Sequence, residues 1–527
     1  MTESVFALAC ARAPEGMEIS AVAAAQPGRI ALWSDQGTMS FAELNAQANR
    51  LVRRMRAAGL AAGDAVALVC SNRSEFAVVR FATHRAGLRL TPINWHLAPE
   101  DIRYIVENAE AKALFLDARV AAVAPGCAQI PRLSLRVAIG GELPDYTSWT
   151  DALAGMDGGD IPDPSLGATM LYPSGTTGRP KGVYRPPLDP VHAAQLQQML
   201  TAVFQFDPES GTDRALATGP LYHTGPFALC FTTPLTAGIG AVIMDKWEPQ
   251  RMLALIEEHR ITHTFCVPTM FNRLLQLPDE ARARHDVSSL RFVIHGAAPC
   301  AVEVKKRMLD WWGPILWEMF AGTEGQGTIV SPQDWLAKPG TVGRPAPGQL
   351  RILDDDGNEV PPGEAGTIYL VNPSGSAFEY YKDPAKTAAV LREGYFTAGD
   401  IGYLDADGYL FLSGRSAEVI ISGGVNIYPQ EIDDVLSQHR AVADVACVGV
   451  PNEDLGEEIK AVVELRPGFV PDDALRQSLV DFCIEHLSKQ KWPRSVDFVA
   501  ALPRSEAGKV LRRALRERYW AGRERQI

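Results

Sequence analysis

The chain alternates short, wholly apolar segments with amphipathic helical patterns, and this alternation restricts the fold more than any other feature. Residues 65–70 have the composition of a strand buried on both faces, residues 88–93 are expected to form another strand, and a helical pattern at residues 75–87 separates them. A helical pattern at 99–107 and an apolar strand at 113–117 repeat the arrangement. Strands without a polar face need helices on both sides of their sheet, which predicts an α/β fold with a doubly wound parallel sheet.

The same alternation returns in the middle of the chain. We expect strands at 215–218, 241–245, 261–267, 290–295 and 315–320, with helices at 249–259 and 269–277. In open α/β sheets, ligands bind at the carboxyl ends of the strands. The residues that follow these strands are therefore candidate walls of a binding site: His223, Val267, Thr269, Ala297, Ala298 and Gly322.

The pattern changes after residue 341, where short strands separated by turn signals indicate a β-rich subdomain. A smaller α+β unit is expected beyond Arg415. Its predicted helices are 429–439 and 472–487, and its predicted strands are 442–450 and 459–465. We predict a large N-terminal domain of mixed sheets at residues 1–414 and a small, mobile C-terminal domain at 415–527.

Composition excludes several classes of partner. The net charge is −12 and no lysine-rich tail occurs, which argues against nucleic acid or an anionic membrane surface. The eight cysteines form no C-x-x-C pair and are expected to be small buried residues in a reducing compartment. Residues 215–244 lack Asp, Glu, Lys and Arg, but prolines and glycines interrupt them too often for a spanning helix. We expect a cytoplasmic protein without an integral membrane segment.

Residues 174–181, which we call the phosphate loop, combine glycines, hydroxyls and one lysine between two apolar flanks. The loop contains Ser174, Gly175, Thr176, Thr177, Gly178 and Lys181. Glycines let backbone N–H groups turn toward anionic oxygens, and the hydroxyls and lysine add donors, which suits polyphosphate. A surface loop that needs only flexibility has no use for this ordering. Gly182 follows the lysine where a Walker motif requires Ser or Thr, so an ordinary P-loop enzyme is disfavoured.

Four more motifs follow the phosphate loop, at residues 320–324, 394–400, 414–415 and 503–513. In this order and spacing, the set resembles the adenylate-forming superfamily, which includes acyl-CoA synthetases, amino-acid adenylation domains and luciferases. The resemblance spans most of the chain. It implies a reaction in which a carboxylate attacks the α-phosphate of ATP, pyrophosphate leaves, and a thiol then displaces AMP.

The resemblance also implies roles for single residues. The phosphate loop would hold the β- and γ-phosphates, Glu324 would bind Mg²⁺, and Thr323 would hydrogen-bond the α-phosphate. Asp400 would accept hydrogen bonds from the ribose hydroxyls, and Arg415 would hold ribose or α-phosphate. Phe320 would stack on adenine, and Gly423 with Gly424 would border a passage for the pantetheine arm of CoA.

Lys509 resembles the lysine that joins the carboxylate to the α-phosphate during adenylation, because Pro503 and Gly508 give it a loop setting. His223, Val267, Ala297 and Gly322 would border the acyl group. Taken alone, each residue has an ordinary explanation: Asp400 as a turn residue, Thr323 and Glu324 as a helix start, Lys509 as a solvated lysine. Their joint order is what favours the functional reading.

Three positions depart from the superfamily pattern. Ala398 stands where relatives usually have Thr, Ala321 replaces a usual Gly, and Ala417 replaces an Asp or Lys hinge residue. We expect hinge motion to persist, because alanine adopts the required dihedral angles, with a changed balance between the two domain poses.

The sequence therefore predicts an ATP- and Mg²⁺-dependent, AMP-forming ligase that joins an apolar carboxylic acid to CoA. An adenylating enzyme that loads a carrier protein is the alternative within the superfamily. A non-catalytic nucleotide sensor is an alternative of another class, which the retention of Lys509 disfavours. A homodimer is compatible with the sequence.

Overall fold

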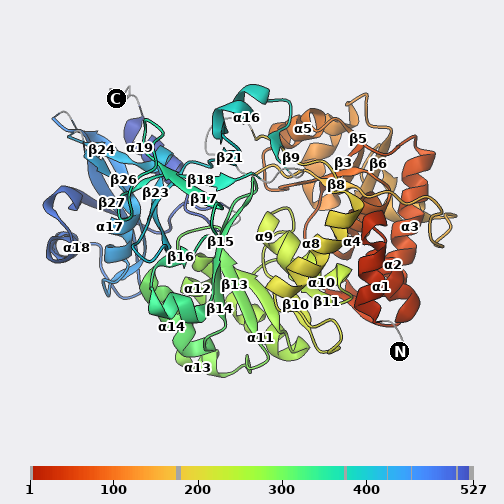
Figure 1. The fold of residues 1–527 in the computed structure, drawn as a ribbon, viewed down its shortest axis with the longest axis horizontal. Coiled ribbons are helices and arrows are strands. Elements are labelled where there is room, and N and C mark those ends of the chain that lie inside the picture. Colours follow the sequence, from red (N-terminus) through yellow and green to blue (C-terminus); the bar gives the residue numbers. More distant parts are fainter. Residues whose placement is uncertain are drawn as a thin grey trace. The chain divides into compact units, whose positions relative to one another are not determined.

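The computed structural model describes residues 4–173, 180–372, 377–423, 425–452, 454–505 and 508–521 (Figure 1). Contacts along the chain divide it into two compact units. Unit 1 comprises Met1–Phe265, Asp279–Val293 and Asn372–Ala389. Unit 2 comprises Cys266–Pro278, Ile294–Val371 and Val390–Ile527. The domain boundary near Arg415 stays a prediction.

Unit 1 contains a six-stranded sheet in the order β7-β6-β5-β3-β4-β8, in which every pair is parallel. Apolar residues on one face, including Val69 and Leu116, pack against Ile102 and Ile105 of α5. Phe115 points to the other face and contacts Trp149 of α7. Helices therefore cover both faces, which confirms the doubly wound prediction. The bounds are β3 Ala65–Val69, β4 Arg89–Ile93, β5 Ala111–Asp117, β6 Leu135–Ile139, β7 Thr147–Ser148, β8 Ala168–Thr169, α4 Ser74–Arg85, α5 Pro99–Asn108 and α7 Trp149–Leu153.

Helix α3 (Phe41–Ala57) shows how local sequence sets an element. The Ser40 side chain accepts from the Glu43 N–H, and the Glu43 carboxylate accepts from the Ser40 N–H at 2.7 Å. This reciprocal capping box satisfies two donors that the first helical turn leaves unpaired. The helix ends before Gly59, whose φ of 86° lies in the left-handed region that glycine tolerates.

A second sheet of unit 1 orders its strands β12-β10-β11-β1-β2. Strands β10, β11, β12 and β1 pair in parallel, and β2 is antiparallel to β1. The bounds are β1 Ile30–Ser34, β2 Gly37–Ser40, β10 Arg214–Ala217, β11 Gly240–Ile243, β12 His263–Cys266 and α11 Pro249–His259. The uncharged segment 215–244 forms β10, the short helices α9 (Thr224–Phe227) and α10 (Thr233–Thr236), and β11, as predicted. Across the described ranges, no helix is both long and apolar enough to cross a membrane.

Unit 2 includes α12 (Pro268–Leu275), the last three residues of β13 (Phe292–Gly296), α14 (Val302–Trp312) and the antiparallel hairpin of β14 (Leu316–Ala321) and β15 (Gln326–Val330). A seven-stranded antiparallel sheet follows in the order β16-β23-β22-β18-β21-β20, with β17 beside β18. It is the β-rich subdomain that the turn signals predict. Its strands are β16 Thr341–Gly343, β17 Leu350–Leu353, β18 Gly366–Val371, β20 Leu391–Arg392, β21 Tyr395–Phe396, β22 Asp400–Leu404 and β23 Leu410–Arg415.

The C-terminal part of unit 2 is an α+β layer, drawn in blue in Figure 1. Its sheet has the order β25-β24-β27-β26, with β28 parallel to β27. Helices α17 and α18 pack on apolar residues of one face, and Leu515 of α19 packs with Val448 and Val462 in a second cluster. The bounds are β24 Ile420–Ser422, β25 Val425–Ile427, β26 Val442–Asn452, β27 Gly456–Leu465, β28 Ser495–Val499, α17 Pro429–Leu436, α18 Asp473–His486 and α19 Arg512–Trp520.

Candidate active site

Strands β22 and β23 place Asp400 directly opposite Arg415 in the antiparallel ladder. The Arg415 Nε donates to the Asp400 Oδ1 at 2.9 Å. Among the described residues, Arg415 is the hydrogen-bond partner of this carboxylate, which leaves Oδ2 open. Burial disfavours the charged guanidinium, but Asp400 and Glu418 outweigh it and raise the Arg415 pKa. The ladder thus holds a carboxylate and a guanidinium in contact where β22 begins and β23 ends.

The β14–β15 hairpin carries Thr323 and Glu324 at its tip. The Gly322 N–H donates to the Gly325 carbonyl at 2.9 Å and closes the turn around them. A Cβ on Gly325 would lie 2.5 Å from the Cζ of Phe396, so only glycine fits beneath that ring. Phe320, on β14, packs beside Gly327 in the same hairpin. Thr323 and Glu324 therefore occupy a hairpin turn, and the alternative of a helix start is wrong.

Lys509 lies on a narrow loop between β28 and α19, which we call the lysine loop (residues 503–511). The Ser505 N–H donates to the Lys509 carbonyl at 2.8 Å, and the Leu511 N–H donates to the Pro503 carbonyl at 2.8 Å. Gly508 takes a φ of 77°, a conformation that side chains rarely adopt. Among its described residues, 503–505 thus pair with 508–511, and Lys509 lies directly after Gly508.

The structure gathers three of the predicted site residues, Glu324, Asp400 and Arg415, around Lys509. Burial lowers the Lys509 pKa, and the nearby Arg415 lowers it further. Asp400, Glu324 and Glu418 act in the opposite direction on the same ammonium group. The neighbours come from the β14–β15 turn, from the start of β22 and from the end of β23. Three separate segments of unit 2 thus place charged groups near enough to influence Lys509.

Val267 and Thr269, at the start of α12, adjoin the tip of the lysine loop. A Cβ on Gly508 would lie 3.2 Å from the Val267 Cγ2, and the Thr269 hydroxyl donates to the Gly508 carbonyl at 2.8 Å. Val267 is buried. The predicted wall after β12 therefore lies beside the loop that carries Lys509.

A second predicted wall forms a constrained turn after β13. A Cβ on Gly296 would lie 2.6 Å from the Met319 carbonyl oxygen, so the chain of β14 passes very close to this position. Ala297 follows with a φ of 68°, which is uncommon for a residue with a side chain. Gly322 lies exposed at the start of the β14–β15 turn.

In unit 1, Lys181 and His223 are the predicted residues that can be placed. The Lys181 ammonium donates to the Asp383 carboxylate, and this hydrogen bond is the main reason that the Asp383 pKa is lowered. His223 precedes α9, and its N–H donates to the Pro220 carbonyl at 3.1 Å. Ser174, Gly175, Thr176, Thr177 and Gly178 lie outside the described residues.

Gly423, after β24, has a φ of 57° and donates its N–H to the Leu455 carbonyl at 2.8 Å. Gly424 lies outside the described residues. Ala417 is exposed in a single turn of 3₁₀ helix, Ser416–Glu418, that follows β23. The structure therefore does not test the roles assigned to these three positions.

Three further residues lie near Lys509, and of these only Thr269 was predicted, as a candidate wall and not as a partner of the lysine loop. Glu418 adds a carboxylate to the cluster and pairs with the Arg512 Nε at 3.2 Å. Arg504 and Thr269 bind the lysine loop itself. The only sequence feature that could have pointed to Glu418 is that it is a carboxylate three residues after Arg415. For the contact between Arg504 and Thr269 there was none, because 235 positions separate the two residues.

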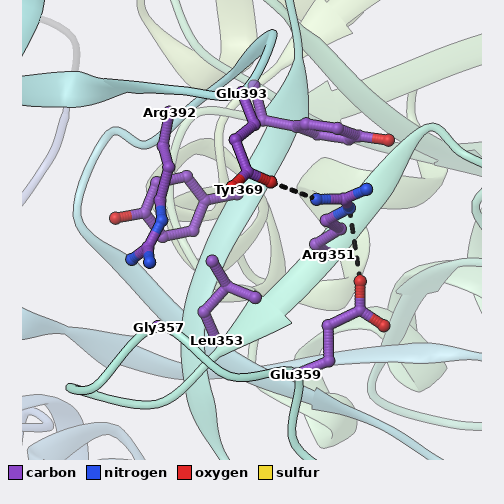
Figure 2. A pocket seen from close by; sticks show the side chains of 8 residues that line it. Arg351, Leu353, Gly357, Glu359, Tyr369, Arg392 and Glu393 are labelled. Atoms are coloured by element: carbon purple, nitrogen blue, oxygen red, sulfur yellow. Dashed lines mark hydrogen bonds and ion pairs between the residues drawn. The ribbon is translucent and has the colours of Figure 1, made fainter.

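A pocket elsewhere in unit 2 has no features of the predicted site. Its lining comes from β17, β18 and the β20–β21 turn and includes Arg351, Tyr369 and Arg392. Figure 2 shows Arg351 between Glu359 and Glu393, with nitrogen to oxygen distances of 3.2 and 3.0 Å. These carboxylates balance the positive charge, so the pocket is not built to attract a phosphate.

The chain resembles known proteins in both sequence and structure. A family model described as AMP-binding enzyme matches residues 19–381, and one described as AMP-binding enzyme C-terminal domain matches residues 431–509. Indoleacetate–CoA ligase of Aromatoleum aromaticum is 33% identical over 93% of this chain and 95% of its own length. Fatty acid–[acyl-carrier-protein] ligase ScoC of Streptomyces coeruleorubidus is 30% identical over 95% of this chain and 96% of its own.

The solved structures show the same likeness over the full chain. ATP-bound MatB from Rhodopseudomonas palustris has a TM-score of 0.83 and 30% identity, covering 96% of this chain and 99% of that one. The anthranilate CoA ligase AuaEII in complex with anthranoyl-AMP has a TM-score of 0.83 and 25% identity, covering 95% and 97%.

Proposed function

Because the chain belongs to the AMP-binding enzyme family, we propose that it is an AMP-forming carboxylic acid:CoA ligase. A carboxylate attacks the α-phosphate of ATP, which gives an acyl-adenylate and pyrophosphate, and the thiol of CoA then displaces AMP. The observation that carries the proposal is the convergence of Glu324, Asp400 and Arg415 on Lys509. A nucleotide sensor has no need of a lysine held among these groups by its own loop.

Asp400 and Arg415 bind the nucleotide in this proposal. The open Oδ2 of Asp400 accepts from the ribose hydroxyls, a task for which an acceptor-only carboxylate is suited. Arg415, fixed through its Nε by Asp400, keeps its terminal N–H groups for the α-phosphate or ribose oxygens. Phe320 offers a ring face for adenine.

Lys509 joins the two reacting anions. The substrate carboxylate and the α-phosphate repel each other as they approach, and an ammonium group between them reduces that cost. Glu324, Asp400 and Glu418 favour the protonated amine that this role requires. Burial and Arg415 oppose it, so the surrounding carboxylates partly offset the lowering of the Lys509 pKa.

Glu324 and Lys181 bind the phosphates that leave as pyrophosphate, Glu324 through Mg²⁺ and Lys181 directly. Across the described residues, no three His, Cys, Asp or Glu side chains gather to hold a metal. Mg²⁺ commonly uses one or two carboxylates together with substrate phosphates, so the single Glu324 fits a metal that arrives with ATP. The phosphate loop takes the β- and γ-phosphates, and Lys181 exchanges Asp383 for them.

The acid is apolar and the acceptor is CoA in this proposal. Val267, Ala297 and Ala298 offer no ion-pair partner for a second charge on the acid. Gly423 and Gly424 border the passage for the pantetheine arm, and Thr323 hydrogen-bonds the α-phosphate. His223 and Gly322 contact the acyl group. The relative ScoC, named for a carrier protein, favours a second candidate, in which a separate carrier protein is the acceptor. We place the enzyme in the cytoplasm as a homodimer.

A screen for acid-dependent pyrophosphate release tests the reaction. ATP and Mg²⁺ are supplied with a panel of short, medium and long fatty acids, indoleacetate, ferulate, steroid-like acids, and sulfoacetate as a doubly charged control. We expect release with at least one apolar acid and none with sulfoacetate. Adding CoA or purified carrier protein then identifies the acceptor. Failure of every acid to yield AMP contradicts the proposal.

A further inference from the structure

Arg504, Thr269 and Asp444 form a connected set of contacts with the tip of the lysine loop. The Arg504 Nη1 donates to the Thr269 Oγ1 at 3.0 Å and to the Gly508 carbonyl at 2.9 Å. The Thr269 hydroxyl donates to the same carbonyl at 2.8 Å. The Arg504 Nη2 forms an ion pair with Asp444 on β26. We call Asp444, Arg504, Thr269 and Gly508 the loop latch.

The latch is a desolvated contact. The Arg504 side chain is 15% exposed and that of Asp444 is 24% exposed. Burial lowers the Arg504 pKa to about 10, and the neighbouring Arg273 adds to this effect. The guanidinium is therefore charged at neutral pH and depends on Asp444 and the Gly508 carbonyl, because an unpaired buried charge is costly.

The latch also determines where Lys509 lies. Gly508 precedes Lys509 directly, and its carbonyl receives both latch donors. The space beside Gly508 is filled on the same side, since a Cβ there would be 3.2 Å from the Val267 Cγ2 and 3.4 Å from the Thr269 Cβ. The carbonyl of the residue before Lys509 is thus bound by Thr269 from α12 and by Arg504 from within the loop.

We propose that Thr269 and Arg504 are positioning residues for adenylation, which hold Lys509 at the place where the carboxylate meets the α-phosphate. The chemistry rests on the proposed function, whereas the latch geometry does not. Lys509 has no task in the attack of CoA on the finished adenylate, so the latch contributes to the first half-reaction and not to the second. Thr269 follows the buried Val267 by two residues and thereby ties the lysine to a predicted wall of the acid site.

Paired variants test the proposal. Thr269→Val removes the hydroxyl at nearly constant shape, Thr269→Ser keeps it, and Arg504→Met removes the guanidinium. Arg476→Met is the matched control, because Arg476 also donates to a backbone carbonyl (Val496) and pairs with an aspartate, Asp473. Each variant is assayed for pyrophosphate release with the best acid of the panel, and for CoA-dependent consumption of the matching synthetic acyl-adenylate.

We expect Thr269→Val to slow pyrophosphate release about five- to tenfold, the effect of losing one or two hydrogen bonds. Arg504→Met should slow it about tenfold or more. Consumption of the adenylate should change less than about twofold in both variants, and Thr269→Ser and Arg476→Met should behave as wild type. Equal losses in both half-reactions, or no loss in the first, would overturn the proposal, because a merely structural contact affects the two alike.

Amide hydrogen exchange without any ligand separates this inference from the proposed function. Thr269→Val should speed exchange at the amides of Ser505, Gly508, Lys509 and Leu511, and Thr269→Ser should not. Unchanged exchange in Thr269→Val shows that the latch does not hold the loop and overturns the inference even if the enzyme is an active ligase. Faster exchange in a protein that no acid activates shows that the latch is real, and that the proposed function and the assigned role are wrong.

Discussion

At the scale of single residues, the pair formed by Asp400 and Arg415 is the clearest part of the candidate site. The ladder of β22 and β23 sets these residues opposite each other, and one hydrogen bond of 2.9 Å orients both side chains. The resemblance to the adenylate-forming superfamily pointed to both residues. The sequence did not indicate that each would orient the other.

Asp400→Asn should weaken ATP binding about 10- to 100-fold. The amide cannot accept two ribose hydrogen bonds as strongly as a carboxylate, and bonds to charged groups contribute about 1.5–3 kcal/mol. Isothermal titration with ATP in the absence of acid measures the effect. Asp405→Asn is the control. It removes a carboxylate partner of Lys338 directly after β22 and should leave the affinity for ATP unchanged. Equal affinity in Asp400→Asn and wild type would remove Asp400 from the nucleotide site.

The lowered pKa of Lys509 predicts a pH dependence. The amine must be protonated to join two anions, and a lowered pKa means that the proton is lost at a lower pH than from an ordinary lysine, with pKa 10.5. The rate of pyrophosphate release should therefore fall as pH rises, with a midpoint below 10.5. The pH dependence of the consumption of preformed adenylate by CoA should be the same in Lys509→Arg as in wild type. A rate of pyrophosphate release that stays constant up to pH 10.5, the ordinary lysine pKa, would contradict the role assigned to Lys509.

At the scale of elements, the β14–β15 hairpin connects core packing to the site. It carries Phe320, Thr323 and Glu324, and its turn closes against the Phe396 ring. Helix α14 supports it from another side, because Lys305 donates to the Glu318 carboxylate on β14 at 2.8 Å. Lys305 is fully buried, and its ammonium lies 4.6 Å from the centre of the Trp335 ring.

Gly325→Ala tests the hairpin. The added methyl group would lie 2.5 Å from the Phe396 Cζ, so the turn or the ring must shift and displace Thr323 and Glu324. We expect pyrophosphate release to fall about tenfold or more, as for a misplaced catalytic group, with the far-UV circular dichroism retained. Gly28→Ala is the control, since no atom lies within 4 Å of its added Cβ. Full activity in Gly325→Ala would mean that the position of Glu324 is not critical.

Glu318→Gln tests the support from α14. Breaking a buried ion pair leaves the Lys305 ammonium without a counter-charge and typically costs about 3–5 kcal/mol. The urea concentration at the midpoint of unfolding, followed by tryptophan fluorescence, should therefore be lower than in wild type. Lys338→Met, which breaks an exposed pair with Asp405 and Asp407, should change that midpoint little. A Glu318→Gln midpoint equal to that of wild type would show that the pair is not a net contributor.

The sequence predicted the central strands β3, β4, β5, β10, β11 and β12 of the two sheets of unit 1, because apolar segments between helical patterns leave few alternatives. It did not predict the outer strands β1, β2, β6, β7 and β8. It gave no expectation for α14 or for α8 (Pro190–Val203). In α14, Lys305 is buried in the core, so the position of charged residues in the sequence does not show which face of this helix is buried. In α8, Val191, Met199 and Val203 are exposed while Gln197 is buried, which reverses the usual pattern.

At the scale of the whole molecule, the site residues come from segments that the sequence separates by nearly two hundred positions. The order of motifs identified Glu324, Asp400, Arg415 and Lys509, and the structure brings them together in unit 2. The order of motifs could not identify Glu418, or the contact of Thr269 with Arg504 and Gly508, because contacts between distant segments depend on packing that no local pattern encodes. With a net charge of −12, the protein must attract polyanionic ATP through such local cations, not through its overall field.

The most direct test of the account compares Lys509→Ala with wild type in the two half-reactions, with Lys491→Ala, which removes an exposed partner of Glu431, as control. The account predicts that Lys509→Ala nearly abolishes acid-dependent pyrophosphate release while CoA still consumes preformed acyl-adenylate at close to the wild-type rate. Equal loss of both half-reactions, or normal pyrophosphate release, would contradict the claim that this lysine joins the acid to the nucleotide.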